Sequence, residues 1–452
     1  MMPGHRDRGR QRRIAYLASP RVLAILAGCA LNLAMLVSIR LTAADPHGGD
    51  LCQDVLAVRQ LLAHQNPYQP FSGCGVMHHL LHPPVYLLFI APFVLPPIAI
   101  GAMVWDVVNL FCLGAGVLVI MRERGVRPSS WQLSIFFILL ALWPPLQRTL
   151  LEGQVSPLLF LLFVLAWRWA RHGRSALAGG ALGLAAALRL FPAFAVVYFF
   201  LRRDWRACFA AAAVFIGCSL LALPLVGVDG YLAYVTREAP ANSTEWIHHP
   251  HNTSLSGLAH LLFTGSFELS PAVSAPALAV PLAVLLIAAL LCLLVWRTLL
   301  GRQRPFAADE RTFLAYVPAM LLVSPMTWLY YHVILLLPML LLCVDIGWLD
   351  ATSQRLPASG TKTPSAVRTR LVRLLAGALA LQWIYDVAER MSLYQLAPPL
   401  GQLVFALPTC SLILLLLVDL LPWRDEAGPD GTALERVPAG AGVSGRTAIG
   451  RF

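Results

Sequence analysis

Residues 276–297 read PALAVPLAVLLIAALLCLLVWR, and no charged side chain precedes the arginine that closes the stretch. An α-helix needs about 20 apolar residues to cross the hydrocarbon core of a bilayer, and this stretch has that length. Similar apolar runs recur along the 452 residues of the chain, and many of them end at arginines. The sequence therefore predicts an all-α protein that crosses a membrane several times.

The composition supports this fold class. Hydrophobic residues make up 58% of the chain and charged residues 13%. A soluble domain carries about 25% charged residues, so membrane lipid is expected to cover much of this protein. The net charge of +11 could suggest a nucleic-acid partner. However, the basic residues lie in short clusters at the ends of apolar runs, as in multi-pass membrane proteins, so no nucleic-acid partner is predicted.

These basic clusters also predict the topology, because they stay in the cytoplasm. The first apolar run is too long for the core of a signal peptide, so we predict an uncleaved span that starts inside. With the arginine-rich connections placed inside, the chain has ten predicted spans. They lie at roughly 20–42, 98–121, 131–147, 154–170, 207–226, 276–296, 311–325, 332–347, 373–391 and 402–423.

This topology predicts three segments: a basic cytoplasmic N-terminus (1–17), a single transmembrane domain (18–423) and a disordered cytoplasmic tail (424–452). Inside the domain, a first outer loop covers 43–97 and a second outer loop covers 227–275. The predicted location is the inner (plasma) membrane, with the two polar loops on its outer face.

The first outer loop contains elements that are too short or too polar to span. Residues 55–62 form an amphipathic stretch that could lie on the membrane surface, and the apolar run after His82 is interfacial or re-entrant by its length. Cys52 and Cys74 lie in the same loop. They can form a disulfide if the loop faces an oxidising compartment, or stay free thiols.

Residues 175–201 are apolar except for Arg189, yet arginines flank them on both sides. A single span would place one of these basic clusters outside. We therefore predict a re-entrant hairpin with Arg189 at its tip. The Gly179-Gly180 pair and Pro192 make a broken helix reasonable at this place.

The chain has no P-loop, no GxGxxG after a strand and no paired CxxC motif, so its chemistry must come from outer loops and helix ends. Short motifs there resemble, in order, those of glycosyltransferase family 87. They are Gly49-Asp50, Asn66-Pro67-Tyr68, His82-Pro83-Pro84, Gly153-Gln154, Leu188-Arg189-Leu190-Phe191-Pro192, Asn252-Thr253-Ser254 and Ser324-Pro325-Met326-Thr327-Trp328. Two departures are Arg189, where the family commonly has lysine, and Tyr330-Tyr331-His332, where many members have a histidine pair.

This resemblance implies a GT-C fold and an inverting transferase on the outer face of the membrane. The donor would be a polyprenyl-phosphate sugar, with mannose favoured and arabinofuranose as the alternative. The acceptor would be a glycolipid or a cell-envelope glycan, and neither a metal nor another cofactor is implied. A lipid or glycan transporter is the main rival, although transporters often have paired broken helices and this chain shows one hairpin. A non-catalytic assembly subunit is a further alternative.

The resemblance implies that Asp50 is the general base that takes a proton from the acceptor hydroxyl. The alternative reading is a solvated loop aspartate or a helix N-cap. Asp54, one helical turn later, is a second candidate for the site. Arg189 is a candidate ligand of the donor phosphate, because a guanidinium suits phosphate and is costly to bury without a function. It could instead reach the interface or pair with a carboxylate.

The remaining candidates for substrate binding are His249, Asn252, Trp328 and His332. Tryptophan can stack on a sugar, although tryptophans also form the aromatic belts of membrane proteins. The histidines around His249 could suggest a metal site, but they lack carboxylates at known ligand spacing. They are predicted to contact acceptor or phosphate, or to be ordinary loop residues.

Overall fold

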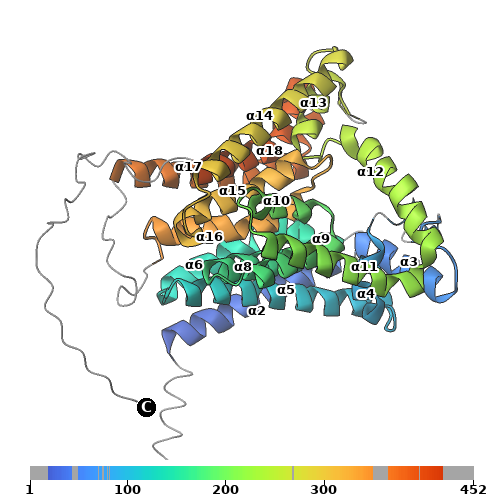
Figure 1. The fold of residues 1–452 in the computed structure, drawn as a ribbon, viewed down its shortest axis with the longest axis horizontal. Coiled ribbons are helices and arrows are strands. Elements are labelled where there is room, and N and C mark those ends of the chain that lie inside the picture. The colour runs from blue at the N-terminus through green and yellow to red at the C-terminus, as the bar shows by residue number, and fades with distance from the viewer. Residues whose placement is uncertain are drawn as a thin grey trace, which may run out of the picture. The chain divides into compact units, whose positions relative to one another are not determined.

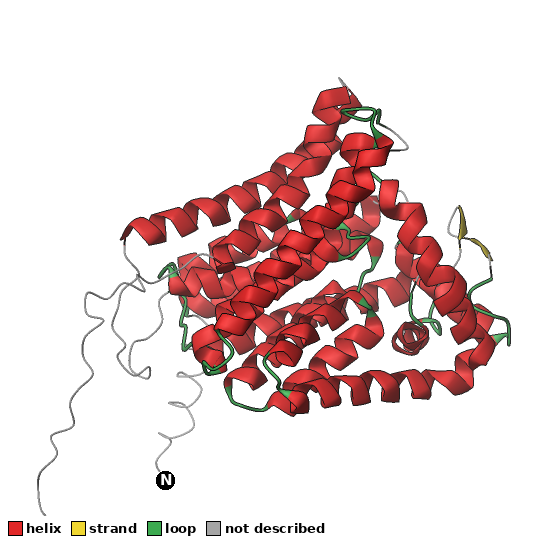
Figure 2. Cartoon of the chain, turned by 45° about the horizontal axis from the view of Figure 1, so that its top comes forward, coloured by secondary structure: helices red, strands yellow, loops and turns green. Residues whose placement is uncertain are grey.

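The described residues form helices that follow the apolar runs of the sequence, together with two short strands (Figures 1 and 2). The structure is a computed structural model. It describes residues 19–42, 49–69, 71–73, 76–78, 80, 82–266, 269–349, 365–395 and 398–420. The predictions made for the N-terminal segment 1–17, for Cys74 and for the tail after Leu420 lie outside these residues. Cys52 is disulfide-bonded.

Six described helices are long and apolar enough to cross a membrane, which supports a multi-pass membrane protein. They belong to α2 (Pro20–Thr42), α5 (Ile98–Glu123), α11 (Trp205–Ala233), α14 (Ala279–Leu300), α17 (Ser365–Arg390) and α18 (Pro398–Leu420). Large apolar side chains face outward on them, such as Phe111 at 74% exposure and Leu221 at 71%. A bent pair, α6 (Ser130–Ala141) and α7 (Pro144–Glu152), gives a seventh span if the two helices cross together.

Fewer described helices than the ten predicted spans are long and apolar enough to cross a membrane. Three further predicted runs do form helices, but these are shorter or more charged. They are α8 (Ser156–Arg171), α15 (Phe306–Val323) and the pair η6 (Leu329–Leu335) and α16 (Leu336–Asp345). The first turns of α15 carry Asp309, Glu310 and Arg311, which shortens its apolar part. The number of crossings beyond six or seven therefore remains a prediction.

The first outer loop contains short elements, as expected. Helix α3 (Asp50–Leu62) is followed by a small antiparallel hairpin of β1 (Phe71–Gly73) and β2 (Val76–His78), which the all-α prediction missed. Then come α4 (Pro84–Ile90) and the 3-10 turn η1 (Ala91–Phe93). Prolines stand in the first turn of both helical elements, where the missing N–H is not needed.

The second outer loop is largely helical. A π-helical turn, η3 (Tyr234–Glu238), continues α11 into α12 (Ala239–Glu245) and the 3-10 turn η4 (Trp246–His248). Figure 1 shows α12 as a light-green helix that rises at an angle from the end of α11, and Gly227 marks a kink within α11. Helix α13 (Leu255–Phe263) and η5 (Pro276–Leu278) lead to α14, and η7 (Leu393–Gln395) precedes α18.

The chain reverses at Arg189, as the sequence predicts. Helix α9 (Ser175–Leu188) ends there, and η2 (Phe191–Ala195) and α10 (Val196–Leu201) follow. A Cβ atom on Gly179 would overlap the carbonyl of Ala207, and one on Gly183 would overlap that of Ala211. Both contacts advance by four residues in the same direction, so α9 and α11 run parallel. The segment between them must therefore return to the end where α9 began.

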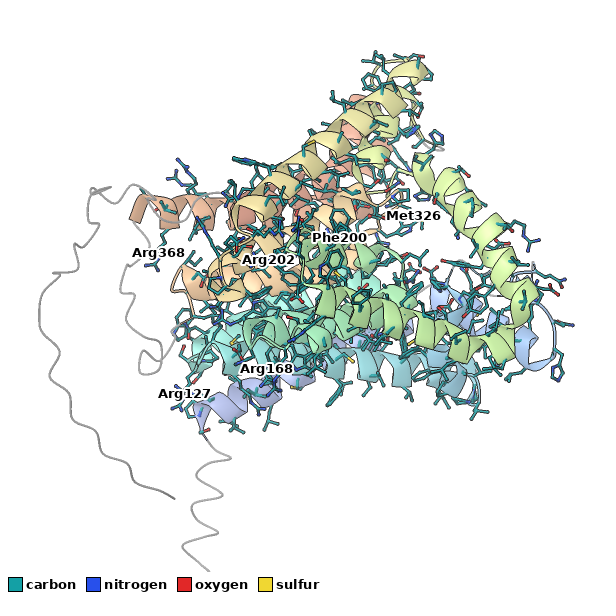
Figure 3. The ribbon with its side chains drawn as sticks, in the orientation of Figure 1. Arg127, Arg168, Phe200, Arg202, Met326 and Arg368 are labelled. Atoms are coloured by element: carbon teal, nitrogen blue, oxygen red, sulfur yellow. The ribbon has the colours of Figure 1, made fainter. Side chains whose placement is uncertain are left out.

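Several arginines gather with carboxylates in one region, here named the basic end (Arg124, Arg171, Arg202, Asp309 and Glu310). Glu310 accepts hydrogen bonds from Arg124 at 2.5 Å and from Arg171 at 2.6 Å, and Asp309 accepts one from Arg202 at 2.6 Å. Figure 3 shows Arg127 and Arg368 toward one side of the ribbon and Met326 toward the other. The predicted cytoplasmic connections thus lie apart from the segment around Met326.

Candidate active site

Asp50 begins α3 beside the end of α7, and Gly49 makes this approach possible. The backbone of Gly49 has φ 51°, which is in the left-handed region that favours glycine. A Cβ atom at this position would also overlap the carboxylate of Glu152. The Gly49-Asp50 pair therefore brings the first outer loop against the turn between α7 and α8.

Gln154 follows that turn and links two predicted site residues. Its side-chain amide donates a hydrogen bond to Oδ2 of Asp50 at 2.5 Å, and its carbonyl oxygen accepts one from Nη2 of Arg189 at 2.5 Å. Asp50 and Arg189 are 139 positions apart by their numbers, yet one side chain touches both. The structure thus brings together the two residues on which the sequence analysis relied most.

Arg189 lies between α9 and η2 in an extended conformation, with φ −147° and ψ 134°. Its side chain is 7% exposed. The guanidinium carbon is 5.4 Å from the ring centre of Tyr86 and 5.5 Å from that of Tyr331. Its Nε has no hydrogen-bond partner among the described residues. A buried cation with a spare donor is suited to hold an anion.

A cavity of about 400 Å³ opens at Arg189. It lies between the tip of the hairpin, α12 and the segment after α15. Its lining residues are Pro83, Arg189, Leu190, Phe191, Phe194, Tyr234, Ala239, Asn242, Ser243, Met320, Val323, Ser324, Pro325, Met326 and Tyr331. The mixture of apolar side chains with one cation and several hydroxyl and amide groups suits a lipid-linked sugar phosphate.

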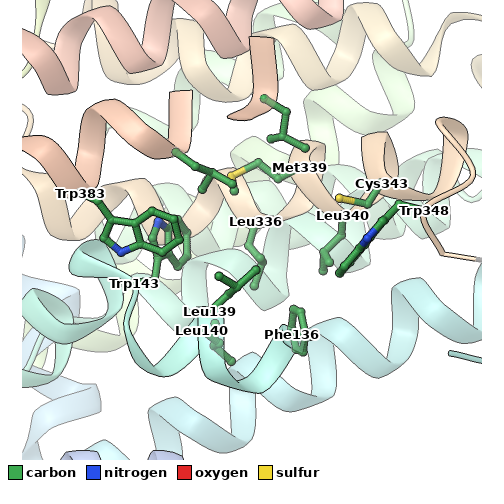
Figure 4. Close-up of a pocket in the computed structure, with 12 residues that line it drawn as sticks. Phe136, Leu139, Leu140, Trp143, Leu336, Met339, Leu340, Cys343, Trp348 and Trp383 are labelled. Atoms are coloured by element: carbon green, nitrogen blue, oxygen red, sulfur yellow. The ribbon is translucent and has the colours of Figure 1, made fainter. Parts of the chain in front are cut away.

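A second cavity, of about 90 Å³, lies between α6, α16 and α17. Figure 4 shows Trp143 and Trp383 at one end of it and Trp348 at the other, with leucines and Met339 between them. Its surface is almost entirely apolar, so it offers no group that could orient a sugar or a phosphate. The cavity at Arg189 is therefore the candidate site.

Asp54 lies one turn after Asp50 and is buried. Its Oδ1 is 2.6 Å from Nδ1 of His82, and the hydroxyl of Tyr68 donates to the backbone carbonyl of His82 at 2.9 Å. Burial raises the pKa of Asp50, and the charge of Asp54 raises this pKa further, whereas His82 and Arg189 oppose the increase. The Asp50 carboxylate is thus a stronger base than an ordinary aspartate.

Asn252 joins the second outer loop to the segment after α15. Its amide donates to the carbonyl of Pro325 at 2.9 Å, and its Oδ1 accepts from the backbone N–H of Thr327 at 3.0 Å and of Ser254 at 3.2 Å. These bonds occupy both ends of the amide. Asn252 therefore links two segments that border the site through its side-chain hydrogen bonds.

A row of aromatic rings extends from the segment after Asn252's partner Thr327 to Asp50. The ring centre of Trp328 is 4.8 Å from that of His249, 5.8 Å from that of Trp246 and 6.2 Å from that of Tyr330, on which it stacks. The hydroxyl of Tyr330 donates a long hydrogen bond, 3.5 Å, to Oδ2 of Asp50. Trp328 and His249 thus lie together on the side of Asp50 that carries Tyr330.

His332, unlike Trp328 and His249, is fully buried. The amide of Gln382 donates to its Nδ1 at 3.2 Å, so its Nε2 carries the hydrogen that faces Thr253 Oγ1 at 3.1 Å. His332 is not among the residues that line the cavity. Both ring nitrogens are used by the protein, and its predicted contact with the donor remains a prediction.

The described residues contain no cluster of three or more histidine, cysteine or carboxylate side chains that could hold a metal ion. Burial is the main cause that lowers the pKa of His249 and of His251 to about 4. Both imidazoles are therefore neutral near pH 7. Nδ1 of His249 accepts a hydrogen bond from the backbone N–H of His251 at 3.3 Å, and Nδ1 of His251 lies 2.5 Å from the hydroxyl of Tyr385. A sugar hydroxyl could therefore bond only to Nε2 of each ring.

Several side chains of this site could not be selected from the sequence. Gln154 was part of a quoted motif, but no rule of spacing showed that it would touch Asp50 and Arg189. Tyr86, Tyr330 and Tyr331 come from separate elements and meet only in the folded chain. For Gln154, the available signal was its position directly after a glycine at a helix end.

Comparisons with known proteins show which proteins the chain is similar to. The model of glycosyltransferase family 87 matches residues 80–325, which is more than half of the chain. Arg189, Gln154 and Asn252 fall within the matched region, while Asp50, Trp328 and His332 fall outside it.

Two similar proteins have mannosyltransferase names. A polyprenol-phosphate-mannose-dependent alpha-(1-2)-phosphatidylinositol pentamannoside mannosyltransferase of Mycolicibacterium smegmatis is 28% identical over 58% of this chain and 60% of its own length. A polyprenol-phosphate-mannose-dependent alpha-(1-2)-phosphatidylinositol mannoside mannosyltransferase of Mycobacterium tuberculosis is 25% identical over 62% of this chain and 67% of its own length. The match thus covers less than two thirds of the first of these relatives.

An alpha-(1->3)-arabinofuranosyltransferase of Mycobacterium tuberculosis is also similar, with 27% identity over 36% of this chain and 38% of its own length.

Proposed function

Because the chain belongs to glycosyltransferase family 87, we propose that it is an inverting glycosyltransferase that uses a polyprenyl-phosphate sugar. The favoured sugar is mannose, and the acceptor is a glycolipid or a cell-envelope glycan. The observation that carries the proposal is the contact of Gln154 with both Asp50 and Arg189. The proposed base, Asp50, and the proposed phosphate-binding cation, Arg189, thus lie on opposite sides of one amide, and Arg189 also lines the cavity.

In the proposed reaction, Asp50 accepts the proton of the acceptor hydroxyl. The acceptor oxygen attacks the anomeric carbon from the face opposite the phosphate, and the bond between that carbon and the phosphate oxygen breaks. The configuration inverts, and polyprenyl phosphate leaves with the bonding electrons. Arg189 stabilises the negative charge that develops on this phosphate, so the leaving group needs no separate proton donor.

The acceptor is proposed to enter beside Trp328. A pyranose ring has an apolar face that can stack on an indole. The side chains of Trp246 and His249 border the indole of Trp328. The mannosyltransferase names of two relatives favour mannose. The shorter match to an arabinofuranosyltransferase keeps arabinofuranose as the second candidate.

We also propose a GT-C architecture with the active site on the outer face of the inner membrane. The positive-inside rule places the basic end in the cytoplasm, and Met326 lies toward the other side of the ribbon in Figure 3. Reporter fusions after residues 75 and 245 should read outside, and fusions after 125, 172, 204 and 360 should read inside. An outside signal at residue 204 would contradict the hairpin.

The decisive experiment is a transfer assay in nanodiscs. Purified protein is given radiolabelled polyprenyl-phosphate mannose, or the arabinofuranose equivalent, together with a phosphatidylinositol mannoside acceptor. We expect label in the acceptor with the mannose donor and none with Asp50→Asn. Asp204→Asn is the matched control, because Asp204 caps α11, close in the chain to Arg202 of the basic end, and does not line the cavity. The absence of transfer from either donor to any envelope glycolipid would overturn the proposal.

A further inference from the structure

Gln154 is held in one orientation by its two partners. A carboxylate can only accept hydrogen bonds and a guanidinium can only donate them. The NH₂ group of Gln154 must therefore face Asp50, and its carbonyl oxygen must face Arg189. Turning the amide over would lose both bonds and leave buried polar groups without partners, which costs free energy at each of them.

The backbone around Gln154 is also fixed. The indole N–H of Trp105 donates to the carbonyl of Gly153 at 2.6 Å, and the amide of Asn109 donates to the carbonyl of Gln154 at 2.9 Å. Gly153 has φ 66°, in the left-handed region. The Gln154 side chain is 1% exposed. Its amide is therefore a rigid support and not a surface group that adapts to its neighbours.

We propose that Gln154 is a positioning residue that aligns Asp50, the proton acceptor, with Arg189, which binds the donor phosphate. This inference rests on the proposed function. Both described hydrogen bonds to the Asp50 carboxylate end on Oδ2, from Gln154 and from Tyr330. This directs Oδ1 to the acceptor hydroxyl. Through its carbonyl oxygen the same amide holds Arg189, so one rigid side chain sets the distance between base and phosphate.

Gln154 also favours the charged form of Asp50, because its N–H bonds to the carboxylate. Many other groups act on this carboxylate, so the effect must be separated from theirs. The titratable or charged groups that face it are Asp54, His82, Tyr86, Glu152, Arg189, Tyr330 and Tyr331. A substitution at position 154 leaves all of them in place.

The test uses Gln154→Met, which keeps the length of the side chain and removes both hydrogen bonds. Gln132→Met is the matched control. Gln132 is also buried and bonded, but it joins Ser129 to the carbonyl of Trp348 at the start of α6. The assay measures transfer of radiolabelled mannose from polyprenyl-phosphate mannose in nanodiscs, with kcat, donor KM and the pH profile determined for each protein.

We expect Gln154→Met to lower kcat about 100-fold, as misplacement of a catalytic group does. The acid limb of the profile should move to higher pH by about one unit, because the carboxylate loses a donor that favoured its charged form. Donor KM should rise roughly tenfold through the loss of support for Arg189. Gln132→Met should leave the pH profile unchanged.

A double substitution separates positioning from a general loss of structure. In an Arg189→Met background, adding Gln154→Met should not raise donor KM further, since no guanidinium is left to be held. The kcat defect should persist there, because Asp50 still loses its support. An additional tenfold rise in donor KM would show that Gln154 does not act through Arg189 and would overturn the inference.

Gln154→Glu provides a second variant if Gln154→Met does not fold. It preserves the shape, and its carboxylate beside Asp50 should also move the acid limb to higher pH. An unchanged acid limb in a folded, active variant overturns the inference while wild-type transfer still supports the proposed function. Absence of transfer by the wild-type protein would instead refute the proposed function itself.

Discussion

Two buried arginine sites in this protein share their aromatic surroundings and differ in charge. At the basic end, Arg124 and Arg171 lie over the ring of Trp167, with guanidinium carbons 5.4 and 5.6 Å from its centre. Both donate to Glu310, whose side chain is 11% exposed. Glu123 supplies a second carboxylate 3.6 Å from Nε of Arg171, so the two cations and two carboxylates neutralise one another within the folded chain.

Arg189 has a similar setting, between the rings of Tyr86 and Tyr331. Its described hydrogen-bond partner, however, is the neutral amide of Gln154, and no ion pair joins it to a carboxylate among the described residues. The negative charge of Asp50 lies beyond that amide. A buried cation without a direct counter-ion is costly, so the site can bind an anion more tightly than a neutral ligand.

The comparison therefore separates two uses of buried charge. At the basic end, substitution should reduce stability and spare the reaction, because the charges satisfy one another. At the cavity, substitution should reduce the reaction and spare stability, because the charges serve a ligand. The transfer rate and the free energy of unfolding, measured on the same set of variants, test this distinction.

The largest effect is expected for Asp50→Asn. The amide has nearly the same shape but cannot take the acceptor proton, so kcat should fall by about 10²–10⁴-fold. Thermal unfolding in detergent should stay within a few degrees of wild type. Single-turnover assays with labelled donor measure the rate, and Asp204→Asn is the control. Retention of more than about a tenth of the wild-type rate would exclude the role of general base.

Glu310→Gln should have the next largest effect, on stability and not on rate. It leaves Arg124 and Arg171 without their shared carboxylate, and breaking a buried ion pair costs about 3 kcal/mol. Denaturant unfolding in detergent measures this loss, and kcat of the folded fraction should be unchanged. Asp229→Asn, at an exposed position on α11, controls for loss of an acidic side chain. Equal stability of the two variants would contradict the distinction.

The reversal of the chain at Arg189 could be predicted from the sequence because it follows from a simple physical rule. Arginines that flank apolar runs stay on one side, and the flanks of residues 175–201 demanded a reversal at Arg189. The close passage of α9 beside α11 at Gly179 and Gly183 bears this out. The number of spans was harder to predict, since the charges at the start of α15 shorten its apolar length.

The site was only partly predictable, since its contacts are tertiary. Asp50 and Arg189 were selected individually, but the bridge through Gln154 depends on how three loops meet. Asn252 and His332 matched family motifs, yet their polar atoms bind other parts of the protein. A motif shows that a residue type recurs at a position, but not whether its side chain faces a ligand or a neighbouring segment.

Arg189→Ala should weaken donor binding by roughly 10–100-fold, since charge-assisted hydrogen bonds to phosphate are lost. Arg189→Lys keeps the charge but loses the fork, so its affinity should fall between those of the alanine variant and wild type. Titration of donor into nanodiscs measures the three affinities. Arg174→Ala removes an exposed arginine as a control. Donor affinity of Arg189→Ala equal to wild type would make this arginine structural, like those of the basic end.

The smallest effect concerns pH and depends on the carboxylate beside the base. Burial first, and then the charge of Asp54, raise the pKa of Asp50. The reaction needs the deprotonated form, so the rate should be lost as the pH falls through this raised pKa. Asp54→Asn removes the like charge and keeps an oxygen near His82, so the acid limb should move to lower pH by up to about one unit. This direction is opposite to that expected for Gln154→Met. The measurement is the pH profile of kcat in nanodiscs, and a shift to higher pH in Asp54→Asn would show that Asp54 does not act on Asp50 through its charge.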